Sequence, residues 1–192
     1  MVVVPESPNG EEVLAPPTRV AWRAWLEANH TRGGGVWLAV PRKNSVHRTT
    51  PYEELVEEAL CFGWIDGLTK RGDDNFHLLR FTPRRKGSIW ARSNKERVER
   101  LIAVGAMTEA GLRVIEAAKA DGSWSRYDDA DALVVHDDLA AALEANSEAK
   151  AVFERLAPSH RKAHLWHVYQ AKKPETRAKR IEDVIRMLLG RA

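Results

Sequence analysis

The chain lacks several features that would assign it to a class at once. Its 192 residues include a single cysteine, Cys61, so no disulfide can form within the chain and a reducing compartment is expected. No apolar run approaches the length of a membrane span, and the N-terminus carries no basic leader or secretory signal. We therefore expect a cytoplasmic protein with no membrane insertion.

A strong excess of one charge is also lacking. Thirty lysines and arginines face 27 acidic residues, which leaves a net charge of only +3. Non-specific nucleic-acid binding usually needs a concentrated basic footprint, so the overall charge gives little support to that function. The sequence contains no Gly-rich phosphate loop, Ser-His-Asp arrangement, paired-cysteine metal motif, internal repeat or low-complexity run. It therefore predicts no catalytic residue, no metal and no cofactor.

What the sequence does contain indicates a folded protein in three segments. Hydrophobic residues make up 44% of the chain and include seven tryptophans, which is ample for a core. Residues 1–17 are rich in proline, and we expect a flexible arm whose apolar start could pair with a sheet edge. Residues 18–126 are expected to form an α+β domain, and residues 127–192 a helical C-terminal region.

The expected fold class is α+β, with a small and mainly antiparallel sheet of about three strands packed by helices and followed by a helical bundle. Bulky apolar residues predict a strand over 36–40, and residues 65–70 and 75–81 read as a hairpin joined at 71–74. Apolar residues at helical spacing predict a helix from about Thr18, capping signals predict helix starts at Thr50 and Ser93, and Thr108 is expected to open a further helix. Further helices are expected over 147–156, 159–171 and 175–189.

The most distinctive stretch lies in the first half of the chain. Residues 61–67 read CFGWIDG, and residues 81–85 and 88–90 read FTPRR and SIW. Large aromatic residues with a few fixed charges are typical of a binding pocket. The predicted ligand-binding residues are Trp37, Trp64, Asp66, Phe81, Arg84, Arg85 and Trp90.

The chemistry of this set indicates what it could hold. Trp64 and Asp66 point to one side of an extended segment, because side chains alternate along a strand. Arg84 and Arg85 follow a proline that ends the strand, and guanidinium groups there suit a phosphate or carboxylate. In this hypothesis Trp64 and Trp90 form stacking walls. The alternative is structural: Asp66 pairs with an arginine and the tryptophans pack the sheet against the helices.

Several motifs resemble those of one bacterial family. In chain order they are WLEANH (25–30), GVWL (35–38), EEALCFGWIDG (57–67), FTPRR, SIW, GAMT (105–108), AKKPETR (171–177) and KRI (179–181). Over residues 18–190 the chain is similar to the YdeI/OmpD-associated family. The resemblance implies a link to protection against bacteriocins and cationic antimicrobial peptides, and to an outer-membrane porin. It implies no catalytic residue, substrate or cofactor.

The cysteine and the histidines are candidates for catalysis or metal binding, but a structural role is the favoured interpretation of each. Cys61 falls in the last turn of its predicted helix, where the helix dipole disfavours a thiolate. His160, His164 and His167 share one helix face, as metal ligands can, but they lack a carboxylate or cysteine partner and are expected to face solvent. Single histidines such as His30 could serve a pocket but are more often structural.

The last predicted helix offers a basic surface. Lys172, Lys173, Arg177 and Arg180 lie at its start, where they could contact phosphates or an acidic partner, or simply be solvated.

Together these features favour a non-catalytic protein that binds a small anionic or aromatic ligand, or a protein partner, in a stress-protection or bacteriocin-protection function. Two alternatives remain open. One is nucleic-acid binding through the basic helix. The other is an enzyme acting on a small anionic substrate near Trp64, Asp66 and Arg84.

Overall fold

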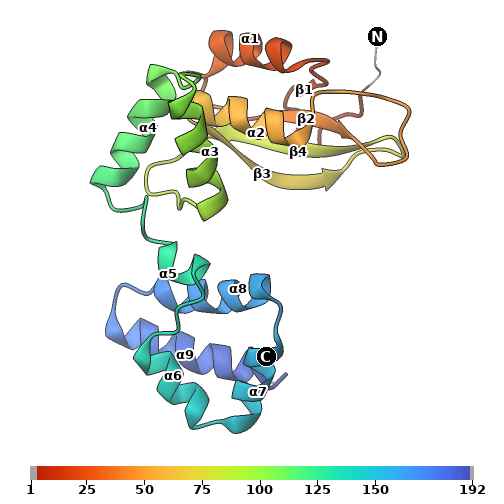
Figure 1. Cartoon of the computed structure of the whole chain (residues 1–192). Helices are drawn as coiled ribbons and strands as arrows, with labels where there is room; N and C mark the ends of the chain where they lie inside the picture. The colour runs from red at the N-terminus through yellow and green to blue at the C-terminus, as the bar shows by residue number, and fades with distance from the viewer. Residues whose placement is uncertain (1–3, 191–192) are drawn as a thin grey trace. The chain divides into compact units, whose positions relative to one another are not determined.

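The structure is a computed structural model that describes residues 4–190, arranged in two compact units (Figure 1). The first unit comprises residues 4–88 and 93–124, and the second comprises residues 89–92 and 125–190. Residues 2 and 3, part of the apolar start that could pair with a sheet edge, lie outside the described residues.

The first unit is built on a four-stranded sheet in the order β1-β2-β4-β3. The strands are β1 (Val13–Leu14), β2 (Val36–Pro41), β3 (Trp64–Arg71) and β4 (Phe76–Pro83). β4 pairs antiparallel with both β2 and β3, so the expected α+β class and mainly antiparallel sheet are confirmed. The strand count is four rather than three, because β1 pairs parallel with β2. Two residues are too short a strand for alternation to reveal in the sequence.

Helices cover one face of this sheet. The first unit contains α1 (Arg19–Asn29), α2 (Tyr52–Cys61), α3 (Arg92–Ala103) apart from its first residue, and α4 (Glu109–Ala120). Figure 1 shows α1 and α2 lying over the sheet. The helix expected from about Thr18 is present, and Thr18 caps it by accepting a bond from the Ala21 N–H at 3.2 Å. Thr50 does not cap α2, because its hydroxyl donates to the carbonyl of Pro16 at 2.8 Å.

The two faces of the sheet pack against different parts of the chain. On one face Trp37 and Phe76 belong to a cluster that is covered by Val4, Val13 and Ala15 of the N-terminal segment. The same segment is held by an ion pair between Glu11 and Arg80 at 2.5 Å. The opposite face carries Phe81, whose ring meets Trp22 of α1 edge-on at 5.6 Å. Strand alternation thus separates two aromatic clusters that lie close together in sequence.

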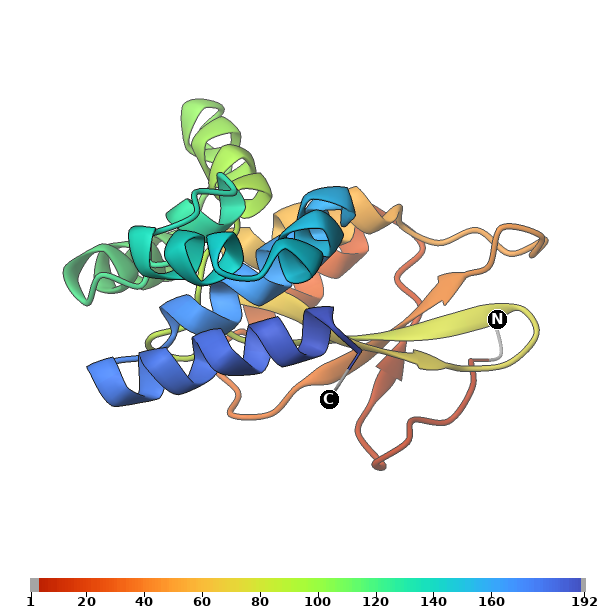
Figure 2. The same cartoon turned by 90° about the horizontal axis from the view of Figure 1, so that it is seen from below.

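The second unit is helical. Its helices are α5 (Asp128–Asp131), α6 (Asp137–Glu144), α7 (Ser147–Arg155), α8 (Pro158–Tyr169) and α9 (Pro174–Leu188), and Figure 2 shows the length of α9 among them. Their apolar faces form a core that includes Leu139, Phe153, Leu165 and Val184, all at most 4% exposed. The expected C-terminal helices are therefore present.

Candidate ligand-binding site

The predicted binding stretch begins on β3 and ends just after β4. The register pairs Asp66 with Phe81 and Trp64 with Pro83, so Trp64, Asp66 and Phe81 project to the same face of the sheet. This face is the one that α1 and α2 cover.

Aromatic rings fill the space between the sheet and α1. Trp25 stacks on Trp22 at 5.2 Å and meets Trp64 edge-on at 5.8 Å. The indole N–H of Trp64 donates to the carbonyl of His30 at 2.9 Å, and its side chain is 0% exposed. Trp64 is therefore a packed floor with a satisfied polar atom, and it presents no open face for stacking.

A recess of about 300 Å³ opens beside this floor. It is lined by His30, Thr31, Phe62, Gly63, Trp64, Pro83, Arg84, Ala110, Arg113, Val114 and Ala117. The end of α1, the turn between α2 and β3, the end of β4 and one face of α4 each contribute a wall. Its volume is at the lower end of the range for small-molecule sites, and its lining combines apolar walls with basic side chains, as such sites commonly do.

The wall formed by α4 depends on two glycines. A Cβ at Gly111 would lie 2.8 Å from the carbonyl oxygen of Leu60, and one at Gly63 would lie 2.7 Å from a methyl group of Val114. Gly63 also has a φ of +75°, which favours glycine. The Thr108 hydroxyl then donates to the carbonyl of Cys61 at 2.6 Å. These contacts bring the start of α4 against the end of α2 and so create the recess.

The charges at the recess are mainly positive. Burial lowers the pKa of Arg84 to about 10, against the opposing effect of nearby Asp66, so the guanidinium is charged at neutral pH. Asp66 accepts a hydrogen bond from the Tyr52 hydroxyl at 2.9 Å. Burial and this bond to Asp66 raise the pKa of Tyr52 to about 12. Arg113 is 65% exposed and lies 3.4 Å from Glu109.

The structure gathers only part of the predicted residue set. Trp64 and Arg84 line the recess, and Asp66 lies close enough to Arg84 to affect its pKa. Trp37 projects to the opposite face, where its indole N–H donates to Asn9 at 2.9 Å.

The other members lie elsewhere. Phe81 is 0% exposed in the core, and Arg85 is exposed without lining the recess. Trp90 is 2% exposed and belongs to the second unit. Neither Trp64 nor Trp90 offers the stacking wall that the sequence hypothesis assigned to it.

Sequence reasoning did not include the α4 wall in the site. Ala110 and Gly111, and Ala117 and Ala118, are two pairs of small residues seven positions apart on α4, which is typical of a helix that approaches its neighbour closely. That pattern could have indicated the close crossing. Nothing in the sequence relates Arg113 to Arg84, because the two residues meet only through the path of the backbone.

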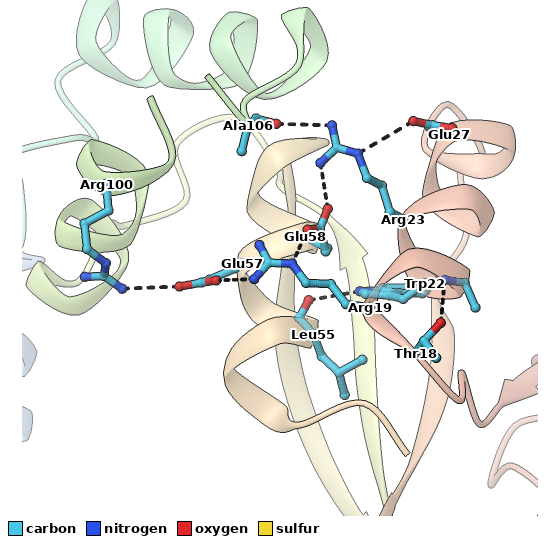
Figure 3. A network of polar contacts seen from close by, with 11 residues as sticks. Thr18, Arg19, Trp22, Arg23, Glu27, Leu55, Glu57, Glu58, Arg100 and Ala106 are labelled. Carbon is cyan, nitrogen blue, oxygen red and sulfur yellow. Dashed lines mark hydrogen bonds and ion pairs between the residues drawn. The ribbon is translucent and has the colours of Figure 1, made fainter. Parts of the chain in front are cut away.

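A charged cluster lies between α1 and α2 (Figure 3). Glu58 is 3% exposed and accepts hydrogen bonds from Arg19 at 2.6 Å and from Arg23 at 2.8 Å. Arg19 also donates to Glu57 at 2.9 Å, and Arg23 to the carbonyl of Ala106 at 3.2 Å. Burial opposes the charge of both arginines, but the bonds to Glu58 and the attraction of the nearby negative charges together outweigh it and raise the pKa of each. This network joins α1 to α2 and to the chain before α4, and its charges satisfy one another.

Cys61 lies at the end of the same helix as Glu58. Its side chain is 0% exposed, and burial together with the charge of Glu58 raises the pKa of the thiol to about 11. The thiol is therefore protonated and shielded, as its position at a helix end suggested.

The recess and its surroundings fall within one recognised region of sequence. A family model described as Domain of unknown function (DUF8412) matches residues 14–114, more than half of the chain. The chain belongs to this family. Ala117 is the one lining residue of the recess that lies beyond the DUF8412 match. No curated protein and no solved structure matches the chain.

A second model, described as Bacteriocin-protection, YdeI or OmpD-Associated, matches residues 132–190. The resemblance to the YdeI/OmpD-associated family is thereby supported, and its match lies on the helical unit. The motifs in the first half of the chain fall in the DUF8412 match instead. Among residues 4–190, no helix is both long and apolar enough to cross a bilayer.

Within residues 132–190, two of the basic side chains predicted as a surface contact other residues of the same unit. Arg177 pairs with Asp138 at 2.5 Å and lies over the ring of Tyr169 at 5.3 Å. Arg180 donates to the carbonyl of His167 at 2.9 Å. Lys172 and Lys173 are exposed. Two of the four residues predicted as a basic surface therefore fasten α9 to the rest of its unit.

The three histidines of α8 do not all face solvent, contrary to expectation. His160 is exposed, whereas His164 and His167 are partly buried. Burial lowers the pKa of His164, and the neighbouring histidines add to this effect. Within residues 4–190, no group of three or more His, Cys, Asp or Glu side chains is placed to hold a metal ion.

Proposed function

We propose that the first unit binds a small anionic molecule in the recess between β4 and α4. The observation that carries this proposal is the placement of Arg84 and Arg113 on one recess whose other walls include Trp64, Phe62 and Val114. Two guanidinium groups supply charged donors for a phosphate or carboxylate, and the apolar walls exclude water from the rest of the ligand.

The two arginines have different functions in this proposal. Arg84 is largely buried, and attraction to an anion is stronger there than in water because the local dielectric constant is lower. Arg113 is more exposed and closes the recess from α4. Asp66 and Tyr52 hold each other beside Arg84, and Glu109 pairs with Arg113, so the carboxylates beside both arginines are already engaged. This arrangement favours binding over general acid–base catalysis.

The test uses phenyl phosphate, which combines a small anion with an aromatic body, and phenol as its neutral counterpart. Isothermal titration calorimetry on the full chain should show saturable binding of phenyl phosphate and none of phenol. Arg113→Glu should weaken that binding by about tenfold to a hundredfold, the equivalent of about 1.5–3 kcal/mol for a hydrogen bond to a charged group. Arg113 is exposed, so the variant should fold normally.

The matched control is Arg71→Glu, which changes the same charge on the hairpin. Arg71 is 80% exposed and lies 3.7 Å from Asp74 as its ion-pair partner. It should bind phenyl phosphate like the wild-type chain. Equal binding of phenol, or full affinity in Arg113→Glu, would contradict the proposal.

We further propose that ligand binding serves a protective function against bacteriocins, which the description of the model matching residues 132–190 supports. Bacteria that express the chain should survive a bacteriocin challenge better than cells with an empty vector. Cells that express Arg113→Glu should lose that advantage. Equal survival of all three strains would argue against protection.

A further inference from the structure

The helical unit contains a second recess, separate from the one described above. It has a volume of about 240 Å³ and is lined by residues of α6, α7 and α8 and by Val135 before them. Figure 1 shows α6 and α7 as consecutive helices, and the whole recess lies within residues 132–190. This volume corresponds to about eight water molecules at liquid density. It suits a molecule of the size of octanoate.

The inner walls of this recess are apolar. Leu143 and Phe153 are 5% and 4% exposed and belong to the core of the unit, and Val135 and Ala140 complete the apolar lining. An alkyl chain placed against these side chains would leave water without losing any hydrogen bond. The recess therefore favours an apolar body.

The charged side chains that line this recess differ in whether they have an ion-pair partner. Lys150 lies 2.6 Å from Glu144 and 3.9 Å from Glu154, so both glutamates have a cationic neighbour. Arg161 also lines the recess, but it forms no ion pair with any residue from 4 to 190. Its Nε is shielded from solvent and has no hydrogen-bond partner in that part of the chain.

The Nε is closed to solvent, so a ligand in the recess would bond to the terminal N–H groups of the Arg161 guanidinium. A carboxylate is the natural partner, since its two oxygens match the fork of donors on a guanidinium. We propose that the helical unit binds an amphipathic monocarboxylate, with its carboxylate on Arg161 and its apolar chain against Leu143 and Phe153. This site is independent of the anion recess of the first unit.

The test compares octanoate with octylamine, a cation of the same chain length, on the full wild-type chain. Titrations followed by amide NMR, below micelle-forming concentrations, should show saturable octanoate binding with shifts at the lining residues of α6, α7 and α8. Octylamine should bind at least tenfold more weakly, because its ammonium would face Arg161 with a like charge and the two glutamates of the lining already have Lys150 as a cationic neighbour. Equal binding of the two, or no binding of octanoate, would overturn the proposal without any need for a variant.

Variants then test the role of Arg161. Arg161→Gln should weaken octanoate binding by about tenfold or more, as expected for the loss of a charged hydrogen-bond partner. Arg161→Lys keeps the charge and should retain part of the affinity. Arg155→Gln, on an exposed part of α7 whose Nε bonds to the carbonyl of Ala151, should bind like the wild type. Full affinity in Arg161→Gln would overturn the assignment.

Arg113→Glu separates this site from the anion recess. It should leave octanoate binding unchanged while it weakens binding of phenyl phosphate. Loss of octanoate binding in Arg113→Glu would place the carboxylate in the first unit and overturn the inference. If Arg113→Glu weakens only the binding of phenyl phosphate, the result supports a separate octanoate site on Arg161.

Discussion

Replacing Gly111 with alanine should destabilise the protein, although the same change in an exposed helix interior stabilises by about 1 kcal/mol. The reason is the crossing of α4 over the end of α2. A Cβ at position 111 would lie 2.8 Å from the carbonyl oxygen of Leu60, 2.7 Å from the Cε of Met107, and in steric conflict with the carbonyl oxygen of Cys61. Met107 can move, but the two carbonyls belong to the backbone of α2.

The size of the effect follows from these contacts. Relieving the clash requires α4 to shift by roughly half an ångström, and overpacking of this kind costs about 1–3 kcal/mol. The shift would also stretch the bond from the Thr108 hydroxyl to Cys61, which contributes about 1 kcal/mol. The gain in helix propensity offsets about one kcal/mol of this loss. We expect a net decrease in the free energy of unfolding of about 2 kcal/mol.

Urea denaturation followed by tryptophan fluorescence measures this change, with Gly34→Ala as the control. A Cβ added at Gly34 would meet no heavy atom within 4 Å, and the residue has no positive φ, so alanine there should be neutral or stabilise by about 0.4–1 kcal/mol. Because α4 forms a wall of the anion recess, Gly111→Ala should also weaken binding of phenyl phosphate. A Gly111→Ala variant as stable as the wild type would refute the close crossing.

Three further predictions concern titratable side chains of the first unit. Glu58→Gln should lower the free energy of unfolding by about 2 kcal/mol, because it replaces the buried carboxylate that accepts charged hydrogen bonds from both Arg19 and Arg23. Glu27→Gln, at a 60% exposed side chain, should change it by less than about 0.5 kcal/mol in urea titrations. The hydrogen bond from Arg80 lowers the pKa of Glu11 to about 2 from an ordinary value of 4.5. The ionised group therefore stabilises the fold above pH 4.5 and loses this effect as the pH falls toward 2, so Glu11→Gln should be less stable than the wild type by about 1 kcal/mol at pH 6 and equal to it near pH 2. An unchanged difference across that range would contradict the ion pair. Cys61 should react with a thiol reagent at pH 7.5 only as fast as the chain unfolds, and rapid labelling of the native protein would show that the thiol is accessible.

The sequence by itself determined the fold class and most helix positions. The cap at Thr18, the glycine after α2 and the alternation of β3 act over a few residues, so they can be interpreted without knowledge of distant neighbours. They placed Trp64 and Asp66 on one side of a strand, and the structure has them there. The aromatic and basic stretch around Trp64 and Arg84 likewise indicated where a recess would lie.

Only the tertiary structure decided which side chains meet. The pairing of β1 with β2, the opposite orientations of Trp37 and Phe81 in the sheet, and the burial of Trp90 in the other unit depend on register and chain path. The recess exists because Gly111 lets α4 approach the end of α2, which brings Arg113 to the same opening as Arg84. Contacts between residues this far apart in sequence are fixed by packing, and local propensity carries no information about them.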